Sequence, residues 1–183
     1  RVANFPGITV DSKVGDRNIN GKDLKIIDLP GIYTLDANTL DERVTRDFIL
    51  KDASDENSAD AIIVVVDATN IKKSLYLIEQ ISELKVPFVV ALNMIDLSIA
   101  RGQKLDLEYL SKHLNGTPIV PTVAVEDEGI EQLDLAVLKV IEEKKSDSKL
   151  PEGFLQDIKK PEYIKKKLAN IDDILKHIIK TKI

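Results

Sequence analysis

The sequence predicts an α/β protein built on a mostly parallel β-sheet, with one antiparallel hairpin strand. Two long apolar runs, "AIIVVV" and "VPFVVAL", alternate with segments of helical periodicity. Runs rich in β-branched residues are typical of strands that a parallel sheet buries on both faces. Asn20-Gly21 separates two further strand-like segments, and Asn-Gly favours a hairpin because both turn positions adopt positive φ. Strands that alternate with helices indicate right-handed crossovers within one sheet.

The first half of the chain is expected to be rich in strands. The segments "TVDSKVGDRNI" and "KDLKIIDL" flank the Asn20-Gly21 turn and are predicted to form the hairpin. Apolar residues at Leu40, Val44 and Phe48 then recur at helical spacing and predict a helix over 38–50. The segment "DAIIVVVDA" predicts a strand buried on both faces.

The second half alternates helices with strands. Leu75, Ile78 and Ile81 align on one face and predict a helix over 72–84. The remaining predicted elements are a buried strand in "VPFVVALNMIDL", a helix near 106–114, a short strand in "TPIVPTVAV", a helix from Gly129 to about Lys144 and a helical tail beyond residue 154.

Composition narrows the class of protein. The 183 residues can bury one sizeable core, and the longest apolar run of six residues is far too short to span a membrane. The chain has no cysteine, which excludes disulfides and thiolate metal sites and indicates a reducing compartment. Residues 1–143 carry a net charge of −10, which argues against a nucleic-acid-binding surface, so we expect no nucleic-acid partner.

The tail differs from the body in charge and in pattern. Residues 144–183 contain 11 lysines against 6 acidic residues, a balance that suits either a solvated helix face or a position beside an anionic membrane. The polar stretch "KSDSKLPEGF" predicts a boundary, with one domain over 1–145 and a linker and the start of a helical domain over 146–183. The first residue is arginine rather than methionine, so we expect a piece of a longer chain.

The tail helix is expected to need a partner surface that this chain hardly supplies. Its apolar residues repeat at helical spacing: Ile164, Leu168, Ile171, Leu175 and Ile178. The run Lys165-Lys166-Lys167 is predicted to be an exposed face, and His113 and His177 are predicted to be solvated or capping residues rather than iron ligands.

Three predicted strands end in residues that suit a nucleotide site. They are Asp28-Leu29-Pro30-Gly31, Asn93-Met94-Ile95-Asp96 and Thr122-Val123-Ala124-Val125. In doubly wound sheets, ligands bind outside the carboxyl ends of the strands. Each motif alone is also explained by turn or capping chemistry, but their order and spacing together are far more specific.

The chemistry of these residues favours guanine. The Asp96 carboxylate can accept from both the ring N–H and the exocyclic amine of guanine, whereas adenine presents the wrong pattern. Asn93 would bond the other edge of the base, and the backbone N–H of Ala124 would donate to its keto oxygen. At the phosphate end, Asp28 would hold Mg²⁺ through a water, and the Gly31 N–H would reach the terminal phosphate. Only a small residue at position 31 allows so close a backbone approach.

These motifs together resemble the G domain of the ferrous-iron transport protein B (FeoB) family over roughly residues 1–143. The resemblance is carried by "RVANFPGITV", "IIDLPGIYTL", "VTRDFIL", "IIVVVDATN", "VVALNMIDL" and "PTVAVEDEGI". Met94 is its most diagnostic residue, because most GTPases have lysine there and this family has methionine, which can still cover one face of the base. The helices from about residue 154 onward resemble the family's helical spacer domain by position more than by motif.

The resemblance implies a Ras-like (P-loop NTPase) fold and a cytoplasmic domain that binds GTP or GDP with Mg²⁺ and hydrolyses GTP to support Fe(II) uptake. It implies a place on the cytoplasmic face of the inner membrane, a membrane domain of the same chain as partner, and leaves a homo-oligomer open. The implied site residues are the first switch (Gly7, Ile8, Thr9, Val10 and Asp11), the second switch (Asp28, Leu29, Pro30 and Gly31), the guanine motif (Asn93, Met94, Ile95 and Asp96) and the last base-contacting loop (Ala124 and Val125). Thr9 and Asp28 would serve the metal.

The sequence departs from the family in the phosphate-binding region. It contains no Gly-x-x-x-x-Gly-Lys-Ser/Thr, and in this family that loop and its strand precede "RVANFPG". We therefore expect a gap in the sheet between the strand ending at Asp28 and the strand ending at Asp67, and weak or no GTP binding by this piece alone. Ile32 stands where Ras-like proteins place a water-orienting glutamine, which predicts slow intrinsic hydrolysis.

Two other classes stay open from the residues alone. One is a soluble TRAFAC-type GTPase of ribosome assembly or RNA modification, although such proteins usually keep the lysine at position 94 and carry basic appendages. The other is a non-enzymatic module with a flavodoxin-like sheet, which would leave the order of the three motifs unexplained.

Overall fold

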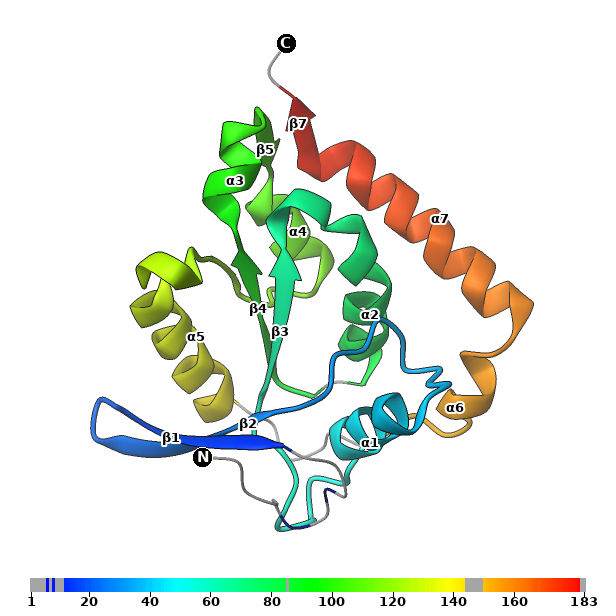
Figure 1. The fold of residues 1–183 in the computed structure, drawn as a ribbon. Coiled ribbons are helices and arrows are strands. Elements are labelled where there is room, and N and C mark those ends of the chain that lie inside the picture. Colours follow the sequence, from blue (N-terminus) through cyan, green and yellow to red (C-terminus); the bar gives the residue numbers. More distant parts are fainter. Residues whose placement is uncertain (1–5, 7, 9–11, 85, 144–149, 182–183) are drawn as a thin grey trace.

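The fold is described from a computed structural model, which covers residues 6, 8, 12–84, 86–143 and 150–181 (Figure 1). The strands are β1 (Lys13–Ile19), β2 (Lys22–Asp28), β3 (Ile62–Asp67), β4 (Phe88–Asn93), β5 (Gln103–Leu105), β6 (Ile119–Pro121) and β7 (Ile179–Thr181). The α-helices are α1 (Leu40–Ile49), α2 (Lys72–Glu83), α3 (Ile95–Ala100), α4 (Leu107–His113), α5 (Ile130–Glu142), α6 (Phe154–Asp157) and α7 (Pro161–Ile178). Two 3₁₀ turns, Ala68–Asn70 and Ala124–Glu126, follow β3 and β6.

The centre of the protein is a parallel sheet in the order β3-β4-β6. Asp67 pairs in register with Asn93, so the carboxyl ends of β3 and β4 lie at one edge. Alternate residues of β4 face opposite sides, because side chains alternate along a strand. Val90 packs into the main core with α2, α4 and α7, whereas Val89 packs with Val137 of α5. The predicted alternation of parallel strands with helices is confirmed.

The hairpin of β1 and β2 forms a sheet of its own and lies across the lower part of the protein in Figure 1. Its turn has both Asn20 and Gly21 at positive φ, as the Asn-Gly signal predicted. Leu24 joins the apolar cluster under α5, and Arg17 forms a bidentate pair with Asp134 of α5 at 2.8 Å and 2.5 Å. As expected, the strands that end at Asp28 and Asp67 do not pair.

One prediction about β3 is wrong. The strand was expected to be buried on both faces, yet Val65 is 68% exposed while Val66 on the opposite face is fully buried. The reason is that α5 covers β4 and β6, and the hairpin packs on α5 instead of continuing the sheet beside β3. The α5 side of β3 is therefore partly exposed, with Ile63 at 37% and Val65 at 68%.

The expectation that the tail lacks a partner surface is also wrong. Helix α7 begins with Pro161 in its first turn, a position that needs no N–H donor, and it runs along α2 and α4 (Figure 1). Ile171, Ile174 and Ile178 are buried in the same core as the sheet. Ile164 and Leu168, which belong to the predicted stripe, are exposed. The division into two domains at residue 145 stays a prediction, but the tail and the body share one core.

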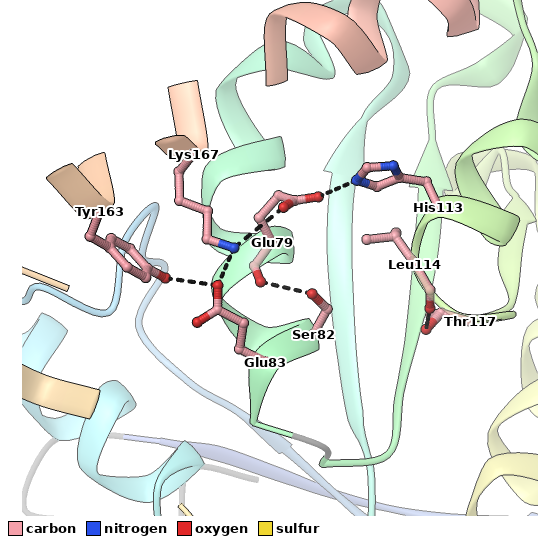
Figure 2. A network of polar contacts seen from close by, with 8 residues as sticks. All are labelled: Glu79, Ser82, Glu83, His113, Leu114, Thr117, Tyr163 and Lys167. Atoms are coloured by element: carbon pink, nitrogen blue, oxygen red, sulfur yellow. Dashed lines mark hydrogen bonds and ion pairs between the residues drawn. The ribbon is translucent and has the colours of Figure 1, made fainter. Parts of the chain in front are cut away.

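One further prediction about polar residues is wrong. Lys167 was expected on an exposed face, but it is only 7% exposed because it forms ion pairs with Glu79 and Glu83 of α2 (Figure 2). His113 is exposed, as predicted, and its Nε2 also lies 2.8 Å from Glu79 Oε1. His177 is half exposed and bonds the Asp173 carbonyl oxygen through Nδ1.

Short elements at the top of Figure 1 were not predicted from the sequence. The helix α3 follows β4 directly, and β5 pairs antiparallel with β7 at the end of the tail. The Asp106 N–H donates to the Ile178 carbonyl at 2.8 Å, and the rings of Tyr109 and His177 stack with centroids 4.9 Å apart. The tail is thus fixed to the segment that follows α3. No helix among the described residues is long and apolar enough to cross a membrane.

Candidate guanine-binding edge

Asn93 joins two of the three predicted motifs. It is the last residue of β4, and its Oδ1 accepts from the Ala124 N–H at 3.0 Å and from Thr122 Oγ1 at 3.1 Å. The loop after β6 is held further by the Thr122 N–H, which donates to the Leu92 carbonyl at 2.9 Å. Because the amide oxygen is used within the protein, the Nδ2 donors are the groups that remain for a ligand acceptor.

The backbone turns sharply after Asn93. Met94 has φ 58°, a left-handed conformation that is uncommon for a residue with a side chain. This single residue ends the strand and begins α3, so that Asp96 falls in the first turn of the helix, where the helix dipole favours a carboxylate. Asp96 is exposed at this edge. Asn93 thus ends β4 and Asp96 lies in the first turn of α3, with Met94 and Ile95 between them.

The loop after β6 places Ala124 and Val125 at the same edge. Both residues are exposed, and Val125 is 92% exposed. The loop closes on α5 at Gly129, which has φ 77° and whose added Cβ would lie 2.2 Å from the Pro121 carbonyl oxygen. Only glycine fits there. The Ala124 N–H, expected to meet the keto oxygen of guanine, donates to Asn93 in this structure.

The second motif lies at the end of the hairpin. Asp28 is the exposed last residue of β2, and the loop after it is held by Thr45 Oγ1, which donates to the Pro30 carbonyl at 2.7 Å. Ile32 is buried in the core. Among the described residues, no atom lies within 4 Å of a Cβ placed on Gly31, so the requirement for a small residue at this position stays a prediction.

A cavity of about 290 Å³ opens between the loop after Asp28 and the guanine motif. It is lined by residues of both, Tyr33 on one side and Asn93 and Met94 on the other. The sequence analysis did not assign the other lining residues to the site: Val65, Val66, Asp67, Asn70, Lys73 and Ser74. Asp67 ends β3 as Asn93 ends β4. This position at the end of a parallel strand could have identified Asp67 as a site residue from the sequence.

Lys73 is the cation of this cavity lining. Its Nζ lies 4.3 Å from the centroid of the Tyr33 ring, a cation–π distance. Asp67 accepts from the Thr69 N–H at 2.8 Å and caps the turn that leads into α2. The cavity lining includes neither Asp28 nor Asp96, so the structure brings Asn93 and Met94 together with Tyr33 of the loop after Asp28, but not with the two predicted carboxylates.

Most of the first switch lies outside the described residues. This applies to Gly7, Thr9, Val10 and Asp11, whereas Ile8 is described and buried. Among the described residues there is no group of three or more histidine, cysteine, aspartate or glutamate side chains that could hold a metal ion.

Comparison with known proteins identifies the family of this chain. A family model described as Ferrous iron transport protein B matches residues 1–137. The chain belongs to this family. Membership in the FeoB family decides against the soluble ribosome-assembly GTPase as the alternative assignment.

Curated relatives extend far beyond this sequence. The Fe(2+) transporter FeoB of Salmonella typhimurium is 39% identical over 141 residues, which cover 75% of this chain and 18% of the transporter. The Fe(2+) transporter FeoB of Escherichia coli K12 is 38% identical over the same shares. The chain thus spans about a fifth of the length of the curated FeoB relatives that it matches.

Solved structures of FeoB domains share the fold. The cytosolic domain of T. maritima FeoB in GDP form II is 27% identical, with a TM-score of 0.80 over 98% of this chain and 89% of that chain. The FeoB G-domain from Methanococcus jannaschii is 37% identical, with a TM-score of 0.65 over 71% of this chain and 80% of that chain. The predicted Ras-like G-domain fold, a mostly parallel sheet with one antiparallel hairpin, is confirmed.

Proposed function

We propose that this FeoB-family chain is the guanine-nucleotide-binding part of a ferrous-iron transporter, in which it binds GTP and GDP and acts as a switch. The observation that carries the proposal is the bridge from Asn93 to Thr122 and Ala124, which joins two base-binding motifs at the carboxyl edge of a parallel sheet. Ligands of open α/β sheets bind at this edge.

The base would be recognised by charge and hydrogen-bond pattern. Asp96 accepts the two N–H groups on one edge of guanine, and the Nδ2 donors of Asn93 serve the acceptor nitrogen on the other. Met94 covers one face of the ring with its thioether, where other GTPases use the stem of a lysine. The Ala124 N–H is shared between Asn93 and the keto oxygen once the base is bound.

The magnesium end of the site would use few protein ligands. Magnesium in nucleotide sites keeps several waters and takes one or two protein ligands plus phosphate oxygens. A single exposed carboxylate at Asp28 fits that chemistry, and Thr9 would add a hydroxyl. The ion, when bound, neutralises charge on the phosphates. The chain's own residues hold and orient the nucleotide around it.

Hydrolysis by such a site would be slow. The residue after Gly31 is Ile32, which is buried in the core and has no group that could orient a water. Positioning by backbone N–H groups therefore supplies most of the catalysis. These features suit a switch that stays in one nucleotide state for long periods.

The phosphate loop expected upstream of Arg1 is needed for tight binding. The exposed Val65 face of β3 and the cavity beside it are where the family's missing strand and loop would add cover. We expect calorimetric titration of the 183-residue protein with GTP to give no binding or millimolar binding. Micromolar affinity for these residues alone would contradict this part of the proposal.

The decisive experiment changes the base preference. In the full-length protein, Asp96→Asn replaces an acceptor with an amide donor, so we expect GTP affinity to fall at least about tenfold and xanthosine triphosphate affinity to rise. Glu126→Gln removes the same charge from the neighbouring exposed loop and should leave both affinities unchanged. Equal GTP affinity in Asp96→Asn and the wild type would overturn the base-site assignment.

Placement in the cell follows from the same proposal. As part of the full-length transporter, the domain would lie on the cytoplasmic face of the inner membrane, with the membrane domain of the same chain as its partner. Self-association of full-length protein is a second possibility, which sedimentation of the purified transporter in both nucleotide states would decide.

A further inference from the structure

The loop over residues 30–35 is fixed to the protein on its inner side. Thr45 Oγ1 of α1 donates to the Pro30 carbonyl oxygen at 2.7 Å. The N–H of Leu35, a fully buried residue, donates to a side-chain oxygen of α2 at 2.8 Å. Between them, Ile32 is buried in the core. These contacts hold the inner side of the loop, so the position of its outer side depends on other groups.

The outer side of this loop carries Gly31 and Tyr33, which are both exposed. Tyr33 is 51% exposed, and among the described residues its hydroxyl has no hydrogen-bond partner. Its ring contacts Lys73 of α2, whose Nζ lies 4.3 Å from the ring centroid. Both side chains line the cavity of about 290 Å³ that Asn93 and Met94 also line. The contact therefore joins the outer side of the loop to α2 at the proposed nucleotide site.

Lys73 occupies a position where its charge needs a partner. It lies in the first turn of α2, which contains no acidic residue, and the positive end of the helix dipole disfavours a cation there. Asp67, the carboxylate of the same cavity lining, is hydrogen-bonded to Thr69. In the part of the chain that the structure describes, Lys73 forms no ion pair, and its ammonium lies over the Tyr33 ring. The negative face of an aromatic ring attracts an ammonium, so this contact offsets the unfavourable position.

We propose that Lys73 is a positioning residue, which holds Tyr33 and thereby places the Gly31 N–H where it reaches the terminal phosphate of a nucleoside triphosphate. The inference rests on the proposed function, in which Gly31 donates to the third phosphate. Because GDP lacks that phosphate, Lys73 favours the binding of GTP over GDP. A cation–π contact at an exposed site corresponds to about a two- to fivefold change in an equilibrium constant.

The first test needs no nucleotide. In the 183-residue protein, the ring current of Tyr33 should shift the Hε proton resonances of Lys73 upfield of those of Lys72, its neighbour on the same helical turn. Tyr33→Phe keeps a ring and should keep this shift, whereas Tyr33→Leu should abolish it. Lys73 resonances that coincide with those of Lys72 in the wild type, or that stay shifted in Tyr33→Leu, overturn the contact.

The second test measures nucleotide affinity in the full-length protein. Lys73→Met should lower the affinity for a non-hydrolysable GTP analogue about two- to fivefold and leave the affinity for GDP unchanged. Lys73→Arg keeps a cation over the ring and should restore the wild-type affinity. Equal losses for the two nucleotides in Lys73→Met would mean that the lysine acts only by general attraction of phosphates, which overturns the positioning role.

A double-mutant cycle links the effect to the ring. Tyr33→Leu should lower the affinity for the GTP analogue as much as Lys73→Met does, because each variant removes one half of the same contact. The double variant should bind no more weakly than either single variant. Losses that multiply in the double variant would show that the two residues act independently, and this result also overturns the proposal.

The chain offers two matched controls. Lys72→Met removes the same charge from the same turn of α2 but from outside the cavity lining. Lys51→Met removes a second cation–π contact, in which Lys51 Nζ lies 4.9 Å from the centroid of the Phe48 ring. Both variants should leave the ratio of the GTP-analogue affinity to the GDP affinity at its wild-type value. A change equal to that of Lys73→Met in either control contradicts a specific role for Lys73.

The two tests separate the inference from the function on which it rests. If the full-length wild-type protein binds neither nucleotide, the proposed function fails and the positioning role fails with it, while the resonances still decide whether Lys73 contacts Tyr33. If the wild type binds both nucleotides and Lys73→Met changes neither affinity, the proposed function stands and the positioning role is refuted.

Discussion

The two faces of the three-stranded sheet are covered to very different extents. On the α2 side, Val64 and Val66 of β3 pack into a continuous core that α2, α4, α6 and α7 complete. On the α5 side, the cluster is small, and Ile63 and Val65 of the same strand are 37% and 68% exposed. The same strand, β3, thus has one face in the buried core and one face that is partly exposed to solvent. We infer that packing on the α2 side contributes most of the free energy of folding, and that packing on the α5 side can change at little cost.

The largest effect is expected from the tail core. Ile174→Ala removes a fully buried side chain of α7 and should lower the free energy of unfolding by about 3–5 kcal/mol, whereas Val65→Ala on the open face should cost less than about 1 kcal/mol. Urea unfolding of the 183-residue protein measures both. Equal losses of unfolding free energy in the two variants would show that the two faces of the sheet contribute equally to stability.

The next effect is electrostatic. Lys167→Met leaves the buried carboxylate of Glu79 and the partly buried carboxylate of Glu83 without their shared cation, and should cost about 3 kcal/mol. Lys165→Met on the exposed side of the same helix changes charge equally and should cost almost nothing. The denaturation midpoints of the two variants measure this difference in stability. A Lys167 variant as stable as the Lys165 variant would mean that the ion network does not stabilise the packing of α7.

A smaller effect is expected where the hairpin meets α5. Arg17→Ala breaks the pair with Asp134, whose arginine is 42% exposed, and should lower stability by about 1 kcal/mol or less. High salt should reduce the difference between variant and wild type, because exposed pairs are screened. A loss above about 3 kcal/mol would mean that the hairpin contributes to the core as strongly as the tail does.

The smallest effect concerns pH and the start of α1. Hydrogen bonds from the Thr39 and Asn38 backbone lower the pKa of Glu42, which completes a capping box with Thr39. A lowered pKa means that this contribution is present above the ordinary value of 4.5 and is lost as the pH falls through the lowered pKa. Glu42→Gln keeps a capping side chain but cannot titrate. The stability of Glu42→Gln relative to the wild type should therefore increase as the pH is lowered from about 6 to about 3. Thermal unfolding at a series of pH values measures this difference.

The sequence predicted the elements with strong local signals. Asn20-Gly21 located the hairpin, the apolar spacing of Leu75, Ile78 and Ile81 located α2, and continuous apolar runs located β3 and β4. The base-binding edge was predicted in part, because Asn93 ends β4, Ala124 follows the neighbouring strand β6, and the two residues meet in space. These features depend on residues close in sequence or on a general rule of parallel sheets.

Features set by distant contacts were not predicted. The burial of Lys167 depends on two glutamates more than 80 positions earlier in the chain, and a run of three lysines carries no sign of which one turns inward. The exposure of Val65 depends on where the hairpin packs. The alternating apolar and polar residues of the hairpin do not specify that position. Short elements such as β5 and β7 form only because the two segments meet.

The antiparallel pairing of β5 with β7 has a consequence for the order in which the protein is made. Chains fold progressively from the amino end during synthesis. The edge strand beside α3 and the groove between α2 and α4 must therefore wait for about the last twenty residues of the tail before they are covered. Until then, Glu79 has no cation from α7, and the apolar residues of α2 and α4 that pack on α7 stay uncovered.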